Sequence, residues 1–159
     1  MGSSCSATIS ESVRHIRGTG LIEEAAAERN RLLRELLASL RRGDVDAVRE
    51  SLRAGAPAGA CDEHGWAPLH YSASAGQAEI SRLLLEHRGD PNATLPDLST
   101  PLMLAVEEAH LSVARLLLAE GALTKCKDED GFTALGRCDP SVQEDFRRLI
   151  SAVATEPAG

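Results

Sequence analysis

Aromatic residues are scarce in this chain, whose 159 residues include one Trp, one Tyr and two Phe. No apolar run approaches the ~20 residues of a membrane-spanning helix, and the apolar stretch of a secretory signal peptide is missing. Glycine-rich phosphate-binding motifs are missing as well. The four cysteines, at positions 5, 61, 126 and 138, form no Cys-x-x-Cys pair of the kind that holds zinc. These absences predict a cytoplasmic protein with no metal, no cofactor and no spanning helix.

Acidic residues outnumber basic ones, and the imbalance falls in the middle of the chain. The net charge is −7, and residues 61–131 carry twelve Asp and Glu against five Lys and Arg. Binding to nucleic acid requires clustered Lys and Arg that neutralise phosphates, so the pattern argues against a nucleic-acid partner. It favours a protein partner with a basic surface, although the same charge also serves solubility.

The chain repeats itself with a period of 33 residues. Pro68 recurs as Pro101, Leu69 recurs as Leu102, and the triple leucine at 83–85 recurs one period later. A period of this length is typical of a solenoid, in which each unit buries its apolar face by stacking on its neighbours.

Each unit has the residue types of two short helices joined by a tight turn. Thr100 and Pro101 suit a helix start, because the hydroxyl can cap free N–H groups and proline is tolerated at the first helical position. Ala67 lacks this cap. Gly43 and Gly76 suit the turn between the helices, where φ is often positive. Second helices are expected near residues 46–53, 79–86 and 112–119. Their i, i+3, i+4 spacing predicts a buried stripe made of Ile80, Leu83, Leu84, Val113, Leu116 and Leu117.

The strings GWAPLHYSASAGQAEISRLLLEHRGDPNA and STPLMLAVEEAHLSVARLLLAEGA closely resemble ankyrin repeats. With LLASLRRGDVDAVRESLRAGA before them and GFTAL after them, the resemblance extends from about residue 36 to about residue 150. It implies an all-α ankyrin-repeat solenoid of helix-turn-helix units with short hairpin loops. The implied function is that of a non-enzymatic interaction module or adaptor that binds other proteins. We expect a monomer.

The repeats are expected to be flanked by simpler segments. Residues 1–20, rich in Ser, Gly and Thr, are predicted to be a disordered N-terminus, and residues 153–159 a disordered tail. Residues 21–35 are predicted to form a capping helix ahead of a repeat domain at 36–152. Its four expected units span 36–60, 61–93, 94–126 and 127–152, with the first and last degenerate. In the last unit, Ser141 and Glu144 are predicted to form a capping box that opens a final helix, with Phe146, Leu149 and Ile150 turned inward.

Three positions depart from the repeat pattern. Arg88 stands where a glycine is expected after the second helix, and we expect Gly89 to take over the left-handed turn. Leu98 occupies the glycine position of the hairpin, and Ala109 occupies the glycine position between the helices. The loops of the third unit are therefore predicted to be strained.

Within the ankyrin-repeat family, a short chain with a degenerate first unit and a clipped last one is similar to myotrophin. The stretches PLHYSASAGQAEI and TPLMLAVEEAHLSVARLLL carry this likeness. Myotrophin-like proteins bind actin capping protein and block it, so the resemblance implies actin capping protein as a partner. The long segment before residue 36 departs from the myotrophin pattern.

Hairpin tips and the ends of first helices make most partner contacts in ankyrin stacks, so the resemblance implies a binding surface here. The matching positions are Glu63, His64, Trp66, Asp97, Glu107, Glu108, Glu129, Asp130 and Phe132. Trp66 is the expected apolar anchor, because tryptophan is favoured at interfaces. The alternative is that Trp66 folds back onto the neighbouring hairpin.

The first residues, MGSSCS, match the N-myristoylation pattern at Gly2, and Cys5 stands where a neighbouring thiol often receives palmitate. One acyl chain holds a protein to a membrane marginally, whereas two anchor it stably. Acylation would place the protein at the inner face of a membrane. Without it, a soluble adaptor is expected.

An enzyme with a Cys/His site is the alternative from another functional class. It would need a cysteine and a histidine brought together in a cleft. His70 lies at the PLH position, where ankyrin histidines hydrogen-bond between neighbouring loops, and His110 follows the turn between two helices. Both are predicted to be structural, and no catalytic, metal-binding or cofactor-binding residue is expected.

Overall fold

The chain folds into a row of helix pairs that stack side by side. The computed structural model describes residues 20–155. Eight helices lie within this range: α1 (Gly20–Arg42), α2 (Val45–Arg53), α3 (Pro68–Ser74), α4 (Ala78–Glu86), α5 (Pro101–Glu107), α6 (Leu111–Ala119), α7 (Ala134–Arg137) and α8 (Pro140–Thr155). The all-α solenoid predicted from the sequence is confirmed.

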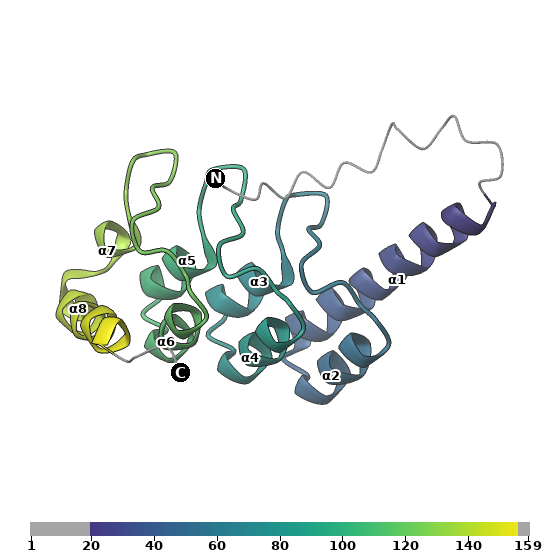
Figure 1. Ribbon diagram of the computed structural model, residues 1–159, viewed down its shortest axis with the longest axis horizontal. Coiled ribbons are helices and arrows are strands. Elements are labelled where there is room, and N and C mark those ends of the chain that lie inside the picture. The colour runs from purple at the N-terminus through teal and green to yellow at the C-terminus, as the bar shows by residue number, and fades with distance from the viewer. Residues whose placement is uncertain (1–19, 156–159) are drawn as a thin grey trace.

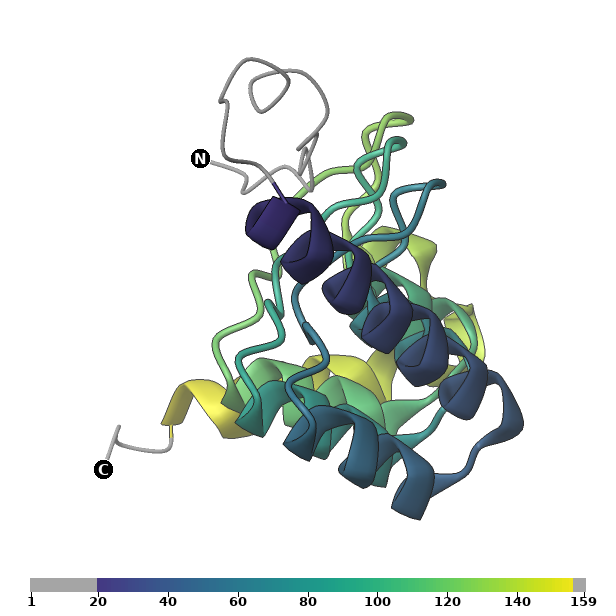
Figure 2. The ribbon, with the colours of Figure 1, turned by 90° about the vertical axis from the view of Figure 1, so that its right-hand side faces the viewer.

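The helices form two layers. α1, α3, α5 and α7 pack against one another in the first layer, and α2, α4, α6 and α8 form the second (Figure 1). Long hairpin loops connect the units and project from the first layer, away from the second (Figure 2). One side of the molecule therefore presents hairpins and first helices, here called the hairpin face. The opposite side presents the second helices, here called the outer face.

Leucine and other aliphatic side chains fill the space between the two layers. Ile80 and Leu84 of α4 and Val113 and Leu117 of α6 are almost completely buried, as the helical spacing predicts. Leu83 and Leu116, which belong to the same predicted stripe, are only partly covered. Leu83 and Leu116, directly before the buried Leu84 and Leu117, thus lie at the border of the core.

The helix starts differ between the second and third units. The Thr100 hydroxyl accepts a hydrogen bond from the Met103 N–H at 3.3 Å, and Pro101 occupies the first helical position, as predicted. In the second unit Ala67 has no side chain that could cap the helix. The ring of His70 makes the reciprocal bond of a capping box, because its Nδ1 accepts from the Ala67 N–H at 3.1 Å.

Within residues 20–155, three residues other than glycine adopt positive φ, namely Arg88 (66°), Leu98 (64°) and Ala109 (58°). The expectation that Gly89 takes over the turn after α4 is wrong. The Arg88 N–H donates to the Leu85 carbonyl and the Gly89 N–H donates to the Leu84 carbonyl at 2.7 Å, so the left-handed residue of this helix end is Arg88. Gly89 has another role, because a Cβ there would lie 2.8 Å from the Leu84 oxygen.

The C-terminal helix begins two residues earlier than predicted. Asp139, and not Ser141, caps α8, since its carboxylate accepts from the Ser141 N–H at 2.8 Å. Pro140 then takes the first helical position, where proline is favoured. Phe146 and Leu149 are buried as expected, and Ile150 is half-buried.

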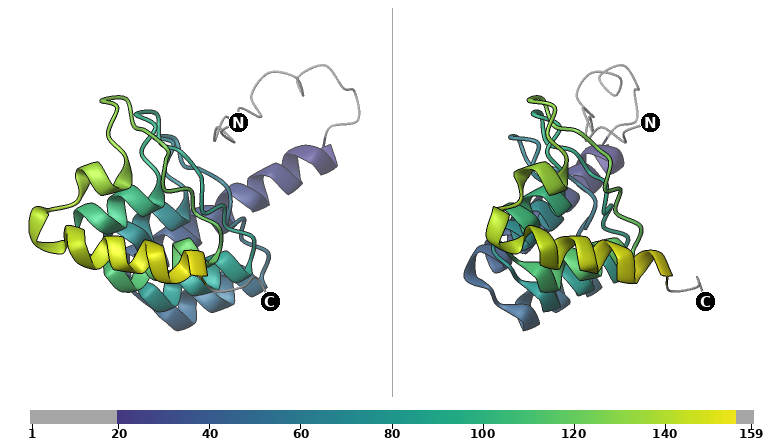
Figure 3. Two further views of the ribbon diagram at one scale, coloured as in Figure 1. Left: turned by 60° about the vertical axis from the view of Figure 1, so that its left-hand side comes forward. Right: turned by 90° about the vertical axis from the view of Figure 1, so that its left-hand side faces the viewer.

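The two ends of the stack are closed by longer helices. At the C-terminal end, α8 covers the last units (Figure 3) and continues to Thr155, so residues 153–155 belong to the helix and not to a tail. At the N-terminal end, α1 is one continuous helix, and the expected boundary between residues 35 and 36 falls inside it. Only its second half is buried, from Leu33 onward, and its first turns extend beyond the stack (Figure 1).

Candidate protein-interaction surface

The hairpin face gathers the residues that the sequence analysis assigns to partner binding. Among those predicted residues, the exposed ones are Glu63, His64, Asp97, Glu107, Glu108, Glu129, Asp130 and Phe132. The carboxylates come from three successive hairpins and from the end of α5, so they form a row along the stack. Trp66 differs from the rest because it is half-buried.

The hairpins that carry these residues are tied to one another. The Glu129 N–H donates to the Asp97 carbonyl at 2.9 Å, which joins the last two hairpins. Gly65 of the preceding hairpin lies so close to Pro96 that a Cβ would come within 2.9 Å of the proline ring. The row of tips is therefore a fixed surface rather than a set of independent loops.

Trp66 lies against two aromatic rings of its own unit. Its ring is 5.0 Å from the Tyr71 ring and 6.1 Å from the His70 ring, centroid to centroid. One side of the indole is held by these contacts. The rest borders a shallow hollow that Leu40, Arg41, Ser74, Ala75 and Gln77 help to line.

Asp62 is the hydrogen-bonding centre of this hairpin. One carboxylate oxygen accepts from the His64 and Trp66 N–H groups, both at 2.9 Å, and the other accepts from the Tyr71 hydroxyl at 2.5 Å. Burial raises the pKa of Asp62, but these hydrogen bonds outweigh it and hold the pKa below its usual value. The Arg41 guanidinium lies 5.4 Å from the Tyr71 ring centroid, which brings a cation from α1 to the same place.

A second centre of the same kind lies two repeats further along. Asp128 is buried, and it accepts from the Phe132 N–H at 2.7 Å and from Arg137 Nε at 2.6 Å. Burial raises its pKa, but these donors more than offset the effect and lower it. Arg137 also pairs with Glu107 at 3.2 Å. Glu107 is thus engaged in an ion pair within the fold.

His70 and His110 have structural roles, as predicted. His70 is buried and its Nε2 donates to the Ala93 carbonyl at 3.1 Å, which links two neighbouring loops. Burial lowers the pKa of His70 to about 4, so the ring is neutral near pH 7. His110 likewise reaches back one repeat, to the Ser74 carbonyl at 3.1 Å.

A Cys/His catalytic pair finds no support in this part of the chain. Cys138 is buried, and burial together with the Asp139 charge raises the pKa of its thiol, which disfavours the nucleophilic thiolate. Within residues 20–155 no three His, Cys, Asp or Glu residues lie close enough to share a metal ion. Gly2 and Cys5, the predicted acylation sites, lie outside the described residues.

Two features of the surface were missed in the sequence analysis. Leu98, noted only as a departure from the glycine pattern, is half exposed at the tip of its hairpin. The outer face carries arginines at positions 49, 82, 115 and 148, which lie one repeat apart on the four second helices. The regular spacing of these arginines could have been seen in the sequence, because it equals the 33-residue period.

Comparison with known proteins agrees with this architecture. The family model for ankyrin repeats in three copies matches residues 26–130. The chain belongs to the ankyrin-repeat family. Its ankyrin repeats indicate a protein–protein interaction module. Among the described helices, none combines the length and the apolar composition that crossing a membrane requires.

Several known proteins are similar to parts of the chain. A 2-5A-dependent ribonuclease of Mus musculus is 41% identical over 71 residues, which cover 44% of this chain and 10% of that protein. An ankyrin repeat-containing protein of Schizosaccharomyces pombe is 33% identical over 93 residues, covering 58% of this chain and 44% of that protein. Cyclin-dependent kinase 4 inhibitor B of Rattus norvegicus is 30% identical over 112 residues, covering 70% and 85%. The first two relatives are thus matched over less than half their length.

Proposed function

We propose that this protein is a non-enzymatic adaptor that binds a partner with a basic surface through its hairpin face. The observation that carries the proposal is the row of exposed carboxylates on three hairpins tied to one another. Exposed charges of one sign steer an oppositely charged partner during its approach, and a fixed row sets the orientation of that approach.

Trp66 supplies the apolar anchor at one end of the row. Its ring is immobilised against Tyr71 and His70, so little side-chain entropy remains to be lost when a partner covers the exposed part. Phe132, at the corresponding position two repeats later, is 53% exposed and supplies a second apolar contact. Exposed carboxylates lie on the same hairpins as both rings, as expected for apolar contacts bordered by polar groups.

The partner can be identified by photo-crosslinking from defined positions. Benzoylphenylalanine is introduced at His64 or Asp130 on the hairpin face, and at Arg53 or Glu86 on the outer face as controls. The proposal predicts that one protein is crosslinked in cells from the hairpin positions and not from the controls. The proposal would be contradicted if crosslinks formed only from Arg53 or Glu86. It would also be contradicted if no specific crosslink formed at the hairpin positions in a competition experiment with unlabelled protein.

Two partners can be tested directly with purified proteins. Actin capping protein follows from the likeness to myotrophin, and cyclin-dependent kinase 4 follows from the name of the rat relative. Binding of either one, measured by surface plasmon resonance, should weaken as salt is added, because the carboxylates of the row are exposed. If neither protein binds, both are excluded as partners, and the crosslinking experiment then decides whether the hairpin face is the binding surface.

Attachment to a membrane through Gly2 myristate and Cys5 palmitate is proposed as a separate property. The motif MGSSCS supports it, and the second acyl chain would make the attachment stable. Cell fractionation of wild type, Gly2→Ala and Cys5→Ser tests it. Wild type should pellet with membranes, Gly2→Ala should not, and Cys5→Ser should be released in part. A fully cytosolic wild type would identify the protein as a soluble adaptor.

A further inference from the structure

The outer face carries one arginine on each second helix. Arg49, Arg82, Arg115 and Arg148 are separated by 33 residues and occupy equivalent positions on α2, α4, α6 and α8. Each lies three residues after a position that is acidic in three of the four helices, namely Asp46, Glu79 and Asp145. The outer face thus carries alternating acidic and basic positions along the stack.

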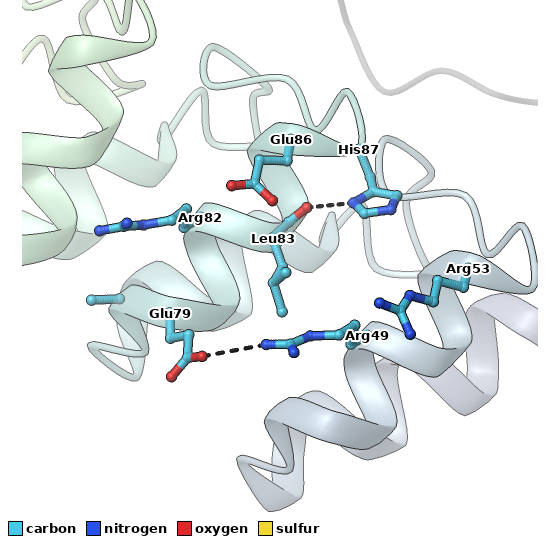
Figure 4. Close-up of a pocket in the computed structure, with 8 residues that line it drawn as sticks. Arg49, Arg53, Glu79, Arg82, Leu83, Glu86 and His87 are labelled. Carbon is cyan, nitrogen blue, oxygen red and sulfur yellow. Dashed lines mark hydrogen bonds and ion pairs between the residues drawn. The ribbon is translucent and has the colours of Figure 1, made fainter.

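The first arginine of this series forms an ion pair. Arg49 of α2 lies 3.5 Å from the Glu79 carboxylate of α4, so an arginine pairs with the acidic residue of the next repeat. Figure 4 shows this pair at the hollow between α2 and α4, and it shows Arg82 pointing away from the pair. If every repeat followed the same rule, Arg82 would pair at position 112 and Arg115 at position 145.

The alternation of acidic and basic residues is interrupted in the third repeat. Position 112 is Ser112, which has no charge to offer Arg82. Asp145 lies instead beside Arg148 of its own helix, at 3.9 Å. Within residues 20–155, neither Arg82 nor Arg115 forms an ion pair or a side-chain hydrogen bond, and both are exposed. Two unpaired guanidinium groups therefore lie on adjacent helices in the centre of the outer face.

These two arginines border a groove with apolar residues in it. The groove lies between α4, α6 and α8, and its lining includes Leu111, Leu116 and Leu149 together with Ser112. Leu111 and Leu116 are half-exposed, so part of this apolar surface is open to solvent. Arg148 also borders the groove, but Glu144 and Asp145 already neutralise it.

We propose that this groove, here called the arginine groove, binds an acidic amphipathic segment of a second protein. Guanidinium groups form strong, directional hydrogen bonds with carboxylates, and leucines of the segment would cover the apolar lining. The segment's charge is opposite to that of the partner expected at the hairpin face. The two surfaces lie on opposite sides of the stack, so they can be occupied together.

A synthetic peptide tests the arginine groove without knowledge of the natural partner. The probe is a fluorescein-labelled peptide of about twenty residues, long enough to form a helix, with Leu on one face and Glu on the other. Fluorescence anisotropy should show saturable binding that weakens with added salt. Arg82→Ser combined with Arg115→Ser should weaken binding about tenfold or more, because two charge-assisted contacts are lost.

A single substitution that restores the broken series gives a sharper test. Ser112→Glu places a carboxylate where Glu79 stands one repeat earlier, and it should pair with Arg82 as Glu79 pairs with Arg49. We expect this variant to lose peptide binding by a similar factor while it folds normally, because Glu is also favourable in the first turn of a helix. Ser112→Gln has the same size without the charge and should keep most of the binding.

Arg29→Ala combined with Arg34→Ala is the matched control, because it removes two exposed arginines from α1, away from the groove. Binding unaffected by this control but lost in Ser112→Glu supports the proposal. The proposal is overturned if wild type shows no saturable binding or if the control loses as much as the groove variant. Stronger binding to phosphatidylserine vesicles or to single-stranded polynucleotide than to the peptide would also overturn it, because the groove would then serve another class of ligand.

Discussion

The Tyr71 hydroxyl donates to the Asp62 carboxylate at 2.5 Å, and the same two positions two repeats later hold Arg137 and Asp128, 2.6 Å apart. The neutral hydroxyl of Tyr71 and the charged guanidinium of Arg137 thus have the same role. Each donates a hydrogen bond to the aspartate that organises its hairpin. The third unit has leucines at both positions, Leu95 and Leu104, and lacks this bond.

Because one donor is neutral and the other is charged, their removal should lower the free energy of unfolding by unequal amounts. Tyr71→Phe should lower the free energy of unfolding by about 1 kcal/mol, the usual value of one hydrogen bond, because Asp62 keeps its two backbone donors. Arg137→Ala should cost more, because it leaves a buried carboxylate with less compensation. Urea unfolding measures both, with the exposed Arg148→Ala as control. Equal midpoints for Arg137→Ala and Arg148→Ala would contradict the argument.

Relieving the strain at Leu98 should stabilise the protein. A leucine at φ 64° carries a steric cost that glycine does not, and its side chain is half exposed, so little burial is lost on its removal. Leu98→Gly should therefore raise the free energy of unfolding by about 1 kcal/mol. Leu98→Ala keeps the Cβ and should change it little.

The opposite result is expected for a glycine that the fold requires. Gly89→Ala should destabilise the protein, because the new Cβ would meet the Leu84 carbonyl oxygen at 2.8 Å. The same urea titrations compare it with Leu98→Gly. A stabilised Gly89→Ala variant would show that the end of α4 can shift to make room.

Stability should fall as the pH is lowered from about 6.5 toward 4. The pKa of His70 is about 4 in the folded protein and 6.5 when exposed, so the unfolded state binds the extra proton in this window. The loss attributable to His70 should reach about 3 kcal/mol at its lower end. Asp62 and Asp128, whose pKa values are lowered by folding, contribute stability above about pH 4 that is lost on further acidification. Urea unfolding of His70→Gln, which starts less stable, should lack the first slope, whereas His64→Gln should keep it.

Trp66→Ala should weaken binding to the protein crosslinked at the hairpin face. We expect a loss of about 2 kcal/mol or more, measured by calorimetry, because a tryptophan that fills a pocket of the partner often dominates an interface. Combined Glu63→Gln, Glu129→Gln and Asp130→Asn should mainly slow association and reduce its dependence on salt. Glu86→Gln on the outer face serves as control. If Trp66→Ala bound this protein with unchanged affinity, Phe132 or Leu98 would be the apolar anchor in place of Trp66.

The sequence predicts the parts of the fold that local chemistry determines. Thr100 and Pro101 mark a helix start, and Gly43 and Gly76 adopt the positive φ of the turn between helices, because these preferences act within a few residues. Arg88 could not be placed in this way, since the register of the hydrogen bonds at the end of α4 decides which residue is left-handed. Asp139 and Ser141 are both good capping residues, and only the position of the helix chooses between them.

The pairing between repeats was harder to predict. The bonds of Arg137 to Asp128 and Glu107 join residues nine and thirty positions apart, and neither partner is unusual in the sequence. The arginine groove depends on a missing charge at Ser112, which becomes visible only when Arg49 is seen to reach across to Glu79.

The first half of α1 extends past the stack with almost no tertiary contact, and Leu21 at its start is 81% exposed. An isolated helical segment of this length is marginal in water, and pairs such as Arg31 with Glu28 add only a few tenths of a kcal/mol each. Backbone amides before residue 30 should therefore exchange with deuterium much faster than those near Leu36 in the same helix. Anything that binds these early turns would slow their exchange, so the protection of this segment provides a direct measure of whether a partner extends the stack.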